Sequence, residues 1–226
     1  MNTTKGKLIV LDGSDGTGKQ TQTKLLVERL QQQGLTVYSL DFPGYDRNVA
    51  GKLIHEALKE GKYGDFLSLP PKIVSVLYAF DRMESASMIQ GWLDSGAVVV
   101  LDRYVSSNQI HQGGKIADDT ERKEFIKWLY TLEFGAAKLP RPDLVLYLNV
   151  PVEVSLRLIK ERSEATGEVI DQAESNEQHL RESQERTLSI IADYPEWKVV
   201  DCSNDGAVKT REEISDLIYQ VVAKYL

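Results

Sequence analysis

The sequence predicts an α/β fold, in which helices cover both faces of a parallel β-sheet. Strand-like and helix-like segments alternate along the chain, as parallel strands joined by helical crossovers require. Residues 97–101 form a continuous apolar run, typical of a parallel strand covered on both faces. A glycine-rich loop at residues 13–18 separates the first strand from a helix. Because no repeat or Pro/Gly-rich linker divides the 226 residues, we expect a single domain over residues 1–226.

The N-terminal elements are indicated by short apolar runs and by glycines. Residues 8–11 are apolar and end in the glycine cluster, which predicts a buried strand. A helix is expected over residues 18–33, and Gly34 is expected to end it. Apolar and polar side chains alternate over residues 36–40, which predicts a second strand.

The middle of the chain contains the most strand-like segment. Residues 48–60 and 71–93 are expected to be helical, and the second of these opens with proline in its first turn, a favoured position. The strand at residues 97–101 follows, and residues 119–134 are expected to form the next helix.

The C-terminal part adds two strands and three helices. A strand at residues 144–150 precedes a helix at residues 152–162. Residues 163–176 are polar with few large apolar side chains, and we predict that they form a mobile flap. The remaining expected elements are a long helix ending near residue 192, a strand at residues 197–200 and an amphipathic helix from residue 211.

Composition excludes several classes of protein. The charge sum of 27 basic and 34 acidic residues is −7, which argues against a broad basic surface for nucleic acid. The single cysteine excludes an internal disulfide, and three scattered histidines show no metal-ligand spacing. No apolar run approaches the roughly 18 residues that span a bilayer. The first residues lack a signal-peptide pattern, so we expect a cytoplasmic protein.

Residues 13–21, GSDGTGKQT, match the phosphate-binding pattern G-x-x-x-x-G-K between a strand and a helix. Such glycines let backbone N–H groups converge on phosphate oxygens, and Lys19 adds a mobile cation. Gln20 stands where Ser or Thr would place a hydroxyl on magnesium, which favours a small-molecule kinase over a motor or switch GTPase. The residues predicted to bind ATP are Gly13, Ser14, Asp15, Gly16, Thr17, Gly18, Lys19, Gln20 and Thr21.

A carboxylate and a guanidinium follow the strand at residues 97–101. Ligands of open α/β sheets bind at the carboxyl ends of the strands, so Asp102 and Arg103 are expected beside the phosphate-binding loop. Aspartate can hold magnesium, and arginine can bind a phosphate through two hydrogen bonds. A simple ion pair at the strand end is the alternative.

These motifs resemble the thymidylate kinase family. The matching segments occur in family order and span most of the chain: GSDGTGKQT, DFPGY, LYAFDR, DRYVSSNQIHQGG, RPDLVLYLNVP and DQAE. The resemblance implies a five-stranded parallel sheet of the nucleoside monophosphate kinase type, a short lid over residues 163–176, and a homodimer. It also implies transfer of the γ-phosphoryl group of ATP to dTMP with Mg²⁺, giving dTDP and ADP, in the synthesis of dTTP.

The resemblance assigns roles residue by residue. Lys19 and Arg103 flank the transferred phosphoryl group, and Asp102 is the carboxylate linked to magnesium. The residues assigned to the acceptor are Asp15 near the 3′-hydroxyl, Phe42 and Tyr45 in the acceptor loop, Tyr78 stacked on the base, Arg82 at the base edge, Arg103, Ser107, Asn108 and Gln112.

One of these assignments has independent support from spacing. Val74, Tyr78 and Arg82 follow one another at intervals of four and share a helix face, which suits a planar base with an acceptor edge. The alternative is that Tyr78 belongs to the core and that Arg82 extends to water.

The chain departs from the family pattern at three positions. Gly44 replaces an arginine often found after Phe-Pro, His111 replaces a common tyrosine against the sugar, and Ala173 stands where some members carry a further tyrosine. These departures bear on acceptor binding and on the strictness of deoxyribose selection.

Basic residues before the lid are candidates for a catalytic cation. Gly16 occupies a position where some members carry arginine, so Arg157 or Arg162 is expected to supply the charge over the phosphates. Asp171 and Glu174 would anchor the lid. The alternatives are that Arg157, Lys160 and Arg162 only balance a helix dipole, and that Asp171 and Glu174 only form a solvated acidic start of a helix.

The sequence thus predicts a cytoplasmic dTMP kinase that binds ATP and dTMP, with no nucleic-acid or membrane partner. Two alternatives remain open at this stage. One is a kinase for another pyrimidine monophosphate, dUMP or UMP, and the other is a nucleotide-binding protein without transfer activity.

Overall fold

A five-stranded, wholly parallel sheet in the order β2-β3-β1-β4-β5 forms the centre of the molecule. The computed structural model describes residues 5–13, 17–166, 177–204 and 207–226. The strands are β1 Lys7–Gly13, β2 Val37–Asp41, β3 Val98–Asp102, β4 Leu144–Asn149 and β5 Trp197–Asp201. A short antiparallel pair, β6 Ser203–Asn204 and β7 Ala207–Val208, follows the sheet.

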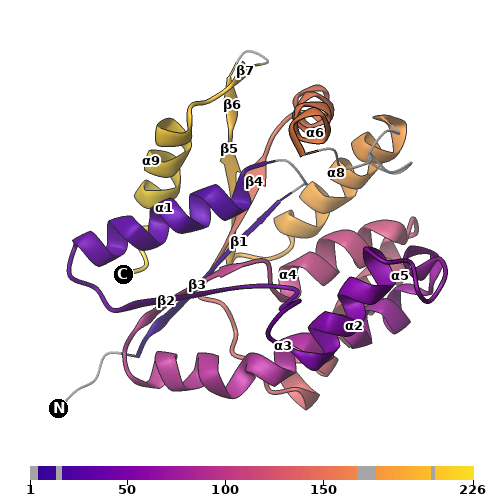
Figure 1. Cartoon of the computed structure of the whole chain (residues 1–226), viewed down its shortest axis with the longest axis horizontal. Coiled ribbons are helices and arrows are strands. Elements are labelled where there is room, and N and C mark those ends of the chain that lie inside the picture. The colour runs from indigo at the N-terminus through magenta and orange to yellow at the C-terminus, as the bar shows by residue number, and fades with distance from the viewer. Residues whose placement is uncertain (1–4, 14–16, 167–176, 205–206) are drawn as a thin grey trace.

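Helices cover both faces of the sheet, as the alternation predicted (Figure 1). Their bounds are α1 Lys19–Gln32, α2 Val49–Leu58, α3 Pro71–Asp94, α4 Val105–Ser107, α5 Asp119–Tyr130, α6 Val152–Thr166, α8 Glu177–Ala192 and α9 Arg211–Val222. The helix α9 begins with a capping box between Thr210 and Glu213, which satisfies two otherwise unpaired amide groups.

Alternate residues of the central strand supply two separate cores. Ile9 and Leu11 pack with residues of α1 and α9, including Leu26 and Ile214. Leu8 and Val10 face the opposite layer, where α3, α5 and α8 contribute Ile89, Phe125 and Ile190. Leu8 to Leu11 have no exposed surface, which explains why this strand is apolar on both faces.

The register brings the carboxyl ends of the strands to one edge. Leu11 of β1 lies opposite Asp102 of β3, and Asp102 lies opposite Asp41 of β2. On the other side, Gly13 lies opposite Leu148 of β4. The glycine-rich loop and the acidic ends of β2 and β3 therefore share one edge of the sheet.

Short helical turns are the main features that the sequence did not indicate. The segment after β3 forms α4, the π-helical turn η2 Asn108–Gln112 and the 3₁₀ turn η3 Gly113–Lys115. Helix α5 ends at Tyr130 and is continued by the π-helical turn η4 Thr131–Ala136. A 3₁₀ turn, η1 Phe66–Ser68, precedes α3. Such π turns often occur at functional sites.

The lid prediction is only partly covered by the described residues. Helix α6 extends to Thr166, four residues beyond its expected end, so the first part of the predicted flap is helical. Residues 167–176 lie outside the described residues.

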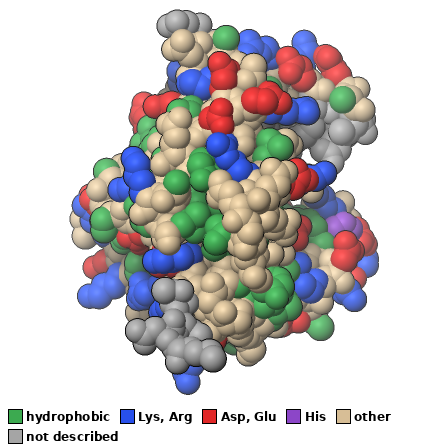
Figure 2. Space-filling model, turned by 90° about the vertical axis from the view of Figure 1, so that its left-hand side faces the viewer, with side chains coloured by type: hydrophobic (Ala, Val, Ile, Leu, Met, Phe, Trp, Pro, Cys, Tyr) green, Lys and Arg blue, Asp and Glu red, His purple; other side chains and the backbone are tan. Residues whose placement is uncertain are grey.

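Among the described helices, none has the length and apolar character needed to cross a membrane. On the face shown in Figure 2, acidic and basic side chains are interspersed.

Candidate active site

The phosphate-binding loop joins β1 to the start of α1. Lys19, the first residue of α1, is buried, and its amine donates a hydrogen bond to the Gly13 carbonyl oxygen at 3.0 Å. Gly13 has a φ of 148°, and a Cβ there would lie 2.6 Å from the Leu148 carbonyl oxygen, so a side chain does not fit. Thr17 is buried, whereas Gln20 and Thr21 are exposed. Ser14, Asp15 and Gly16 lie outside the described residues, and their roles stay predictions.

Asp102 stands at the end of β3 beside this loop, as predicted. Burial raises its pKa to about 6, although the nearby positive charges of Lys19 and Arg103 act in the opposite direction. The negative charges of Asp12 and Asp41 contribute to the increase. A further cation bound beside this carboxyl group would favour its charged form.

The donor set suits magnesium held jointly by the protein and a phosphate. Magnesium is usually bound through one or two carboxylates together with substrate phosphates and water. Among the described residues, no three His, Cys, Asp or Glu side chains form an all-protein metal cluster. Asp102 provides the carboxylate, and it is the residue that we expect to hold the ion.

Asp12, a residue that the sequence analysis did not single out, links the end of β1 to the first helical turn after β3. It has no exposed surface and accepts hydrogen bonds from the Gly13 amide at 2.9 Å and from the Ser106 and Ser107 hydroxyls at 2.6 and 2.8 Å. Ser107 was predicted to lie near the base. Because its hydroxyl proton is directed to Asp12, Ser107 can offer a ligand only an acceptor lone pair.

Arg103 is held in an unusual backbone conformation at the same edge. Its φ is 65°, in the left-handed region, and its amide donates to the Leu11 carbonyl oxygen at 2.9 Å. Its guanidinium Nη1 lies 2.9 Å from Nε2 of His111 and 3.8 Å from a carboxylate oxygen of Asp12. A non-glycine residue with this φ at a strand end is a frequent sign of a functional site.

The structure buries Arg82 much more deeply than the sequence suggested. It is 1% exposed, and it forms a two-point ion pair with Glu133 of η4, which has no exposed surface. Its Nη1 donates to the Tyr104 carbonyl oxygen at 3.2 Å. The alternative that Arg82 extends to water is therefore wrong. Its contact with a base stays a prediction.

Asn108 and Gln112 present acceptor atoms on the turn η2. The Asn108 amide nitrogen donates to Glu133 at 2.9 Å and to the Ser75 carbonyl oxygen at 3.2 Å, which directs its Oδ1 away from both groups. Gln112 is 3% exposed, and its Oε1 has no hydrogen-bond partner among the described residues; the Ser75 hydroxyl is in the same situation. Buried atoms of this kind usually have a partner, which a bound ligand can supply.

Tyr78 lies one helical turn before Arg82 and is partly exposed. Its ring packs against Phe66, with the ring centroids 6.3 Å apart. It also touches the small cluster around Val74, so one face of Tyr78 belongs to the core. The predicted helix face of Val74, Tyr78 and Arg82 is present on α3, and its Arg82 shares the carboxylate of Glu133 with the side chain of Asn108 in η2.

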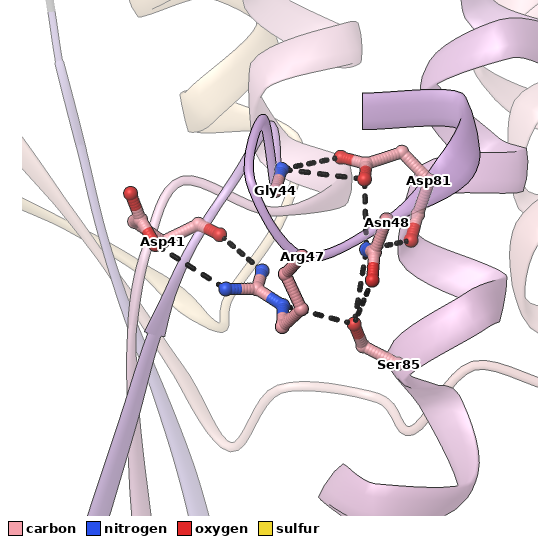
Figure 3. A network of polar contacts seen from close by, with 6 residues as sticks. All are labelled: Asp41, Gly44, Arg47, Asn48, Asp81 and Ser85. Atoms are coloured by element: carbon pink, nitrogen blue, oxygen red, sulfur yellow. Dashed lines mark hydrogen bonds and ion pairs between the residues drawn. The ribbon is translucent and has the colours of Figure 1, made fainter. Parts of the chain in front are cut away.

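The acceptor loop is fixed by Asp81 (Figure 3). This buried carboxylate accepts from the Gly44 amide at 3.0 and 3.2 Å and from the Asn48 side chain at 2.8 Å. Burial raises the pKa of Asp81, against the effect of these hydrogen bonds. The loop opens with a cis peptide bond between Phe42 and Pro43.

Arg47 occupies the space beside Gly44, where the family often has arginine. A Cβ on Gly44 would lie 2.8 Å from Arg47 Nη2. The guanidinium donates to the Asp41 carbonyl oxygen at 2.7 Å (Figure 3). It lies 5.3 Å from the centroid of the Phe42 ring. A cation is thus present in this loop, three residues later in the sequence than in the family pattern. Phe42 itself is buried, and Tyr45 packs edge-on to His55.

The lid residues are only partly described. Arg157 is exposed on α6 and lies 3.9 Å from Glu161. Arg162 belongs to the same helix, but the placement of its side chain is outside the described part of the chain, as are Asp171 and Glu174. Which cation acts on a phosphate therefore stays a prediction.

Comparisons with known proteins identify the family of this chain. A family model described as thymidylate kinase matches residues 11–214. A thymidylate kinase of Mycobacterium tuberculosis is 32% identical over 186 residues, 82% of this chain and 84% of the relative. One of Schizosaccharomyces pombe is 30% identical over 96% of this chain and 93% of its own. A solved structure of a thymidylate kinase from Candida albicans has a TM-score of 0.72 at 24% identity, covering 98% and 92% of the two chains.

Proposed function

The chain belongs to the thymidylate kinase family and phosphorylates dTMP, and we propose that it does so by direct transfer of the ATP γ-phosphoryl group at the sheet edge around Lys19, Asp102 and Arg103. The fold is that of a P-loop nucleoside monophosphate kinase. Phosphoryl transfer depends mainly on positioning and on neutralising charge, which these residue types provide.

The observation that carries this proposal is the convergence of three charged groups at the carboxyl ends of β1 and β3. Lys19 is buried against the loop, Asp102 has a raised pKa, and Arg103 is fixed beside the buried Asp12. We assign Lys19 to the phosphate oxygens of ATP and Arg103 to the phosphoryl group in transit. Asp102 would hold magnesium, which neutralises charge on the phosphates when bound.

We assign the acceptor base to the space between α3 and η2. Tyr78 offers a partly exposed ring for stacking, and Arg82 has only donors, which suit the O4 edge of thymine. Asn108 Oδ1 accepts no hydrogen bond from the described residues, so it suits the N3–H of thymine or uracil. Gln112 and Ser75 supply further unpaired atoms nearby. A donor at the O4 edge and an acceptor for N3–H favour a pyrimidine with a keto group at position 4 over cytosine.

The remaining parts of the proposal concern the lid and assembly. We expect Arg157 or Arg162 to approach the phosphates when residues 163–176 close. We also expect a homodimer in the cytoplasm. An exposed apolar stripe on α3, formed by Ile73, Phe80 and Met83, supports a second copy of the chain as its partner, together with the exposed Val49 of the adjacent α2.

Substitution of the loop lysine tests the proposal. Lys19→Met should lower kcat by at least 100-fold because it removes a charge that stabilises the transition state. Lys24→Met is the matched control on the same helix, since Lys24 is largely exposed and pairs with Glu28 at 3.9 Å. Both variants should keep the circular dichroism spectrum of the parent. A Lys19→Met variant with the kcat of the parent would reject the assigned role of the loop.

A further inference from the structure

His111 is in direct contact with the predicted catalytic arginine. Its Nε2 lies 2.9 Å from Nη1 of Arg103. A guanidinium carries only donors and keeps its charge in proteins, so the imidazole nitrogen must be the acceptor in this hydrogen bond. A doubly protonated imidazole would place a donor against a donor and a positive charge against a positive charge. The contact therefore requires a neutral His111 with its proton on Nδ1.

The contact with His111 is one of several that hold Arg103 in place. The backbone of Arg103 is fixed by its bond to Leu11 and by a φ of 65°. A carboxylate oxygen of Asp12 lies 3.8 Å from Nη1, and Asp12 is itself immobilised by hydrogen bonds from Ser106 and Ser107. Asp12 attracts the charge, and His111 supplies the directional acceptor that sets the orientation of the guanidinium plane.

His111 lies on the same turn as the groups that face the acceptor base. The turn η2 carries Asn108 and Gln112 as well as His111, all within one helical turn. The hydrogen bond to His111 thus links Arg103 to η2, the turn that we expect to contact the base. An acceptor bound against η2 would then meet an arginine whose side chain is already oriented.

We propose that His111 is a positioning residue, which orients the Arg103 guanidinium towards the transferring phosphoryl group. This inference rests on the role assigned to Arg103 in the proposed function. A flexible arginine would spend part of its time away from the phosphate, and a displacement of about 1 Å can reduce a rate about 100-fold. The role differs from a contact with the sugar, which would act on acceptor affinity.

Steady-state kinetics of four variants test this role. His111→Leu removes the acceptor, and we expect it to lower kcat about 10- to 100-fold with little change in either KM. His111→Gln places an amide oxygen near the position of Nε2, so it should recover most of that loss. Arg103→Ala should lower kcat more than it weakens ATP binding. In the Arg103→Ala background, His111→Leu should lower kcat less than twofold further, because the group that it positions is gone.

Three kinetic outcomes would overturn the proposal. His111→Leu with the kcat of the parent is the first, and a raised KM for dTMP alone, as a sugar contact predicts, is the second. The third is an equal effect of His111→Leu in the parent and in Arg103→Ala, which would show that the two side chains act independently. Thermal unfolding of each variant identifies any that does not fold, and the following measurement does not depend on activity.

Nitrogen NMR of the imidazoles separates this inference from the proposed function. The chain has three histidines, and His111→Gln identifies the signals of His111 by their loss. At pH 7.5 we expect an unprotonated Nε2 and a protonated Nδ1, with a clear change of both shifts in Arg103→Ala. A protonated Nε2, or shifts insensitive to Arg103→Ala, would overturn the contact. If the parent failed to phosphorylate dTMP while the NMR result held, the proposed function would be rejected and the His111–Arg103 contact would be retained.

Discussion

The buried carboxylate of Asp102, which we assign to function, lowers the stability of the ligand-free protein. Burial raises its pKa from 3.8 to about 6, so the folded protein binds this proton more tightly than the unfolded chain does. Above pH 6 the carboxylate is charged in both states, and the ligand-free fold carries the full cost of burying the charge. As the pH falls through 6 towards 4, the folded state takes up the proton first and the cost disappears.

Asp102→Asn should therefore stabilise the ligand-free protein while abolishing most activity. A pKa difference of this size corresponds to an upper limit of about 3 kcal/mol at pH 7.5, and part of it is screened by solvent. Urea unfolding at pH 7.5 and at pH 4.5 measures the effect, and the gain should be smaller at the lower pH. A gain of the same size at both values, or a loss of stability, would show that burial of the charge is not the cause.

A functional residue could be predicted from the sequence only where it belongs to a recognisable motif. Lys19, Asp102 and Arg103 were predicted because their chemistry follows from a loop pattern and from a position at a strand end. Glu133 gave no such signal, since it lies between Leu132 and Phe134 in a segment that otherwise reads as an ordinary helix. Only the fold reveals that it pairs with Arg82, which lies 51 residues away.

At the scale of elements, α6 links the sheet to the predicted lid. The sequence predicted its start correctly but ended it at residue 162, because the polar residues that follow lack an apolar face. The structure continues the helix to Thr166, where pairs such as Lys160 and Glu164 at 4.0 Å support exposed turns. The turns η2 and η4 could not be predicted, since five and six residues are too few for a helical period to be recognised in the sequence.

Two cations on α6 provide a matched pair of substitutions. Arg157→Met should lower kcat at least tenfold if Arg157 approaches the phosphates in the closed state. Lys160→Met is the control, because Lys160 is exposed on the same helix and is similarly close to a glutamate four residues later. Initial rates at saturating ATP and dTMP measure both. Equal rates for Arg157→Met and the parent would assign the lid charge to another residue, with Arg162 the next candidate.

For the whole molecule, the alternation of strands and helices predicted the class of fold and both helical layers. The strand order is not contained in that alternation, and it was implied only by the resemblance to a family.

The surface of the whole molecule carries an exposed apolar stripe. Apolar side chains on α3 remain exposed although their helix packs on the sheet with its other face, and this stripe is our expected dimer interface.

Phe80→Glu should therefore convert a dimer to a monomer. Phe80 is 51% exposed at the centre of the stripe, and a buried unpaired carboxylate would cost several kcal/mol in an interface. Leu226→Glu is the control, because Leu226 is also an exposed apolar residue but lies at the C-terminus. Sedimentation velocity at several concentrations distinguishes the species. A monomeric parent, or a dimeric Phe80→Glu variant, would refute this interface.

The central claim, transfer of a phosphoryl group from ATP to dTMP, is tested most directly by a coupled assay of ADP release. The assay compares dTMP, dUMP and dCMP with ATP and magnesium. We expect kcat/KM to fall in the order dTMP, dUMP, dCMP. The lost methyl group should cost about 0.8 kcal/mol, and the amino group of cytosine should leave buried donors unpaired at about 1–3 kcal/mol. No ADP release with any of the three, or turnover of dCMP as fast as that of dTMP, would contradict the account.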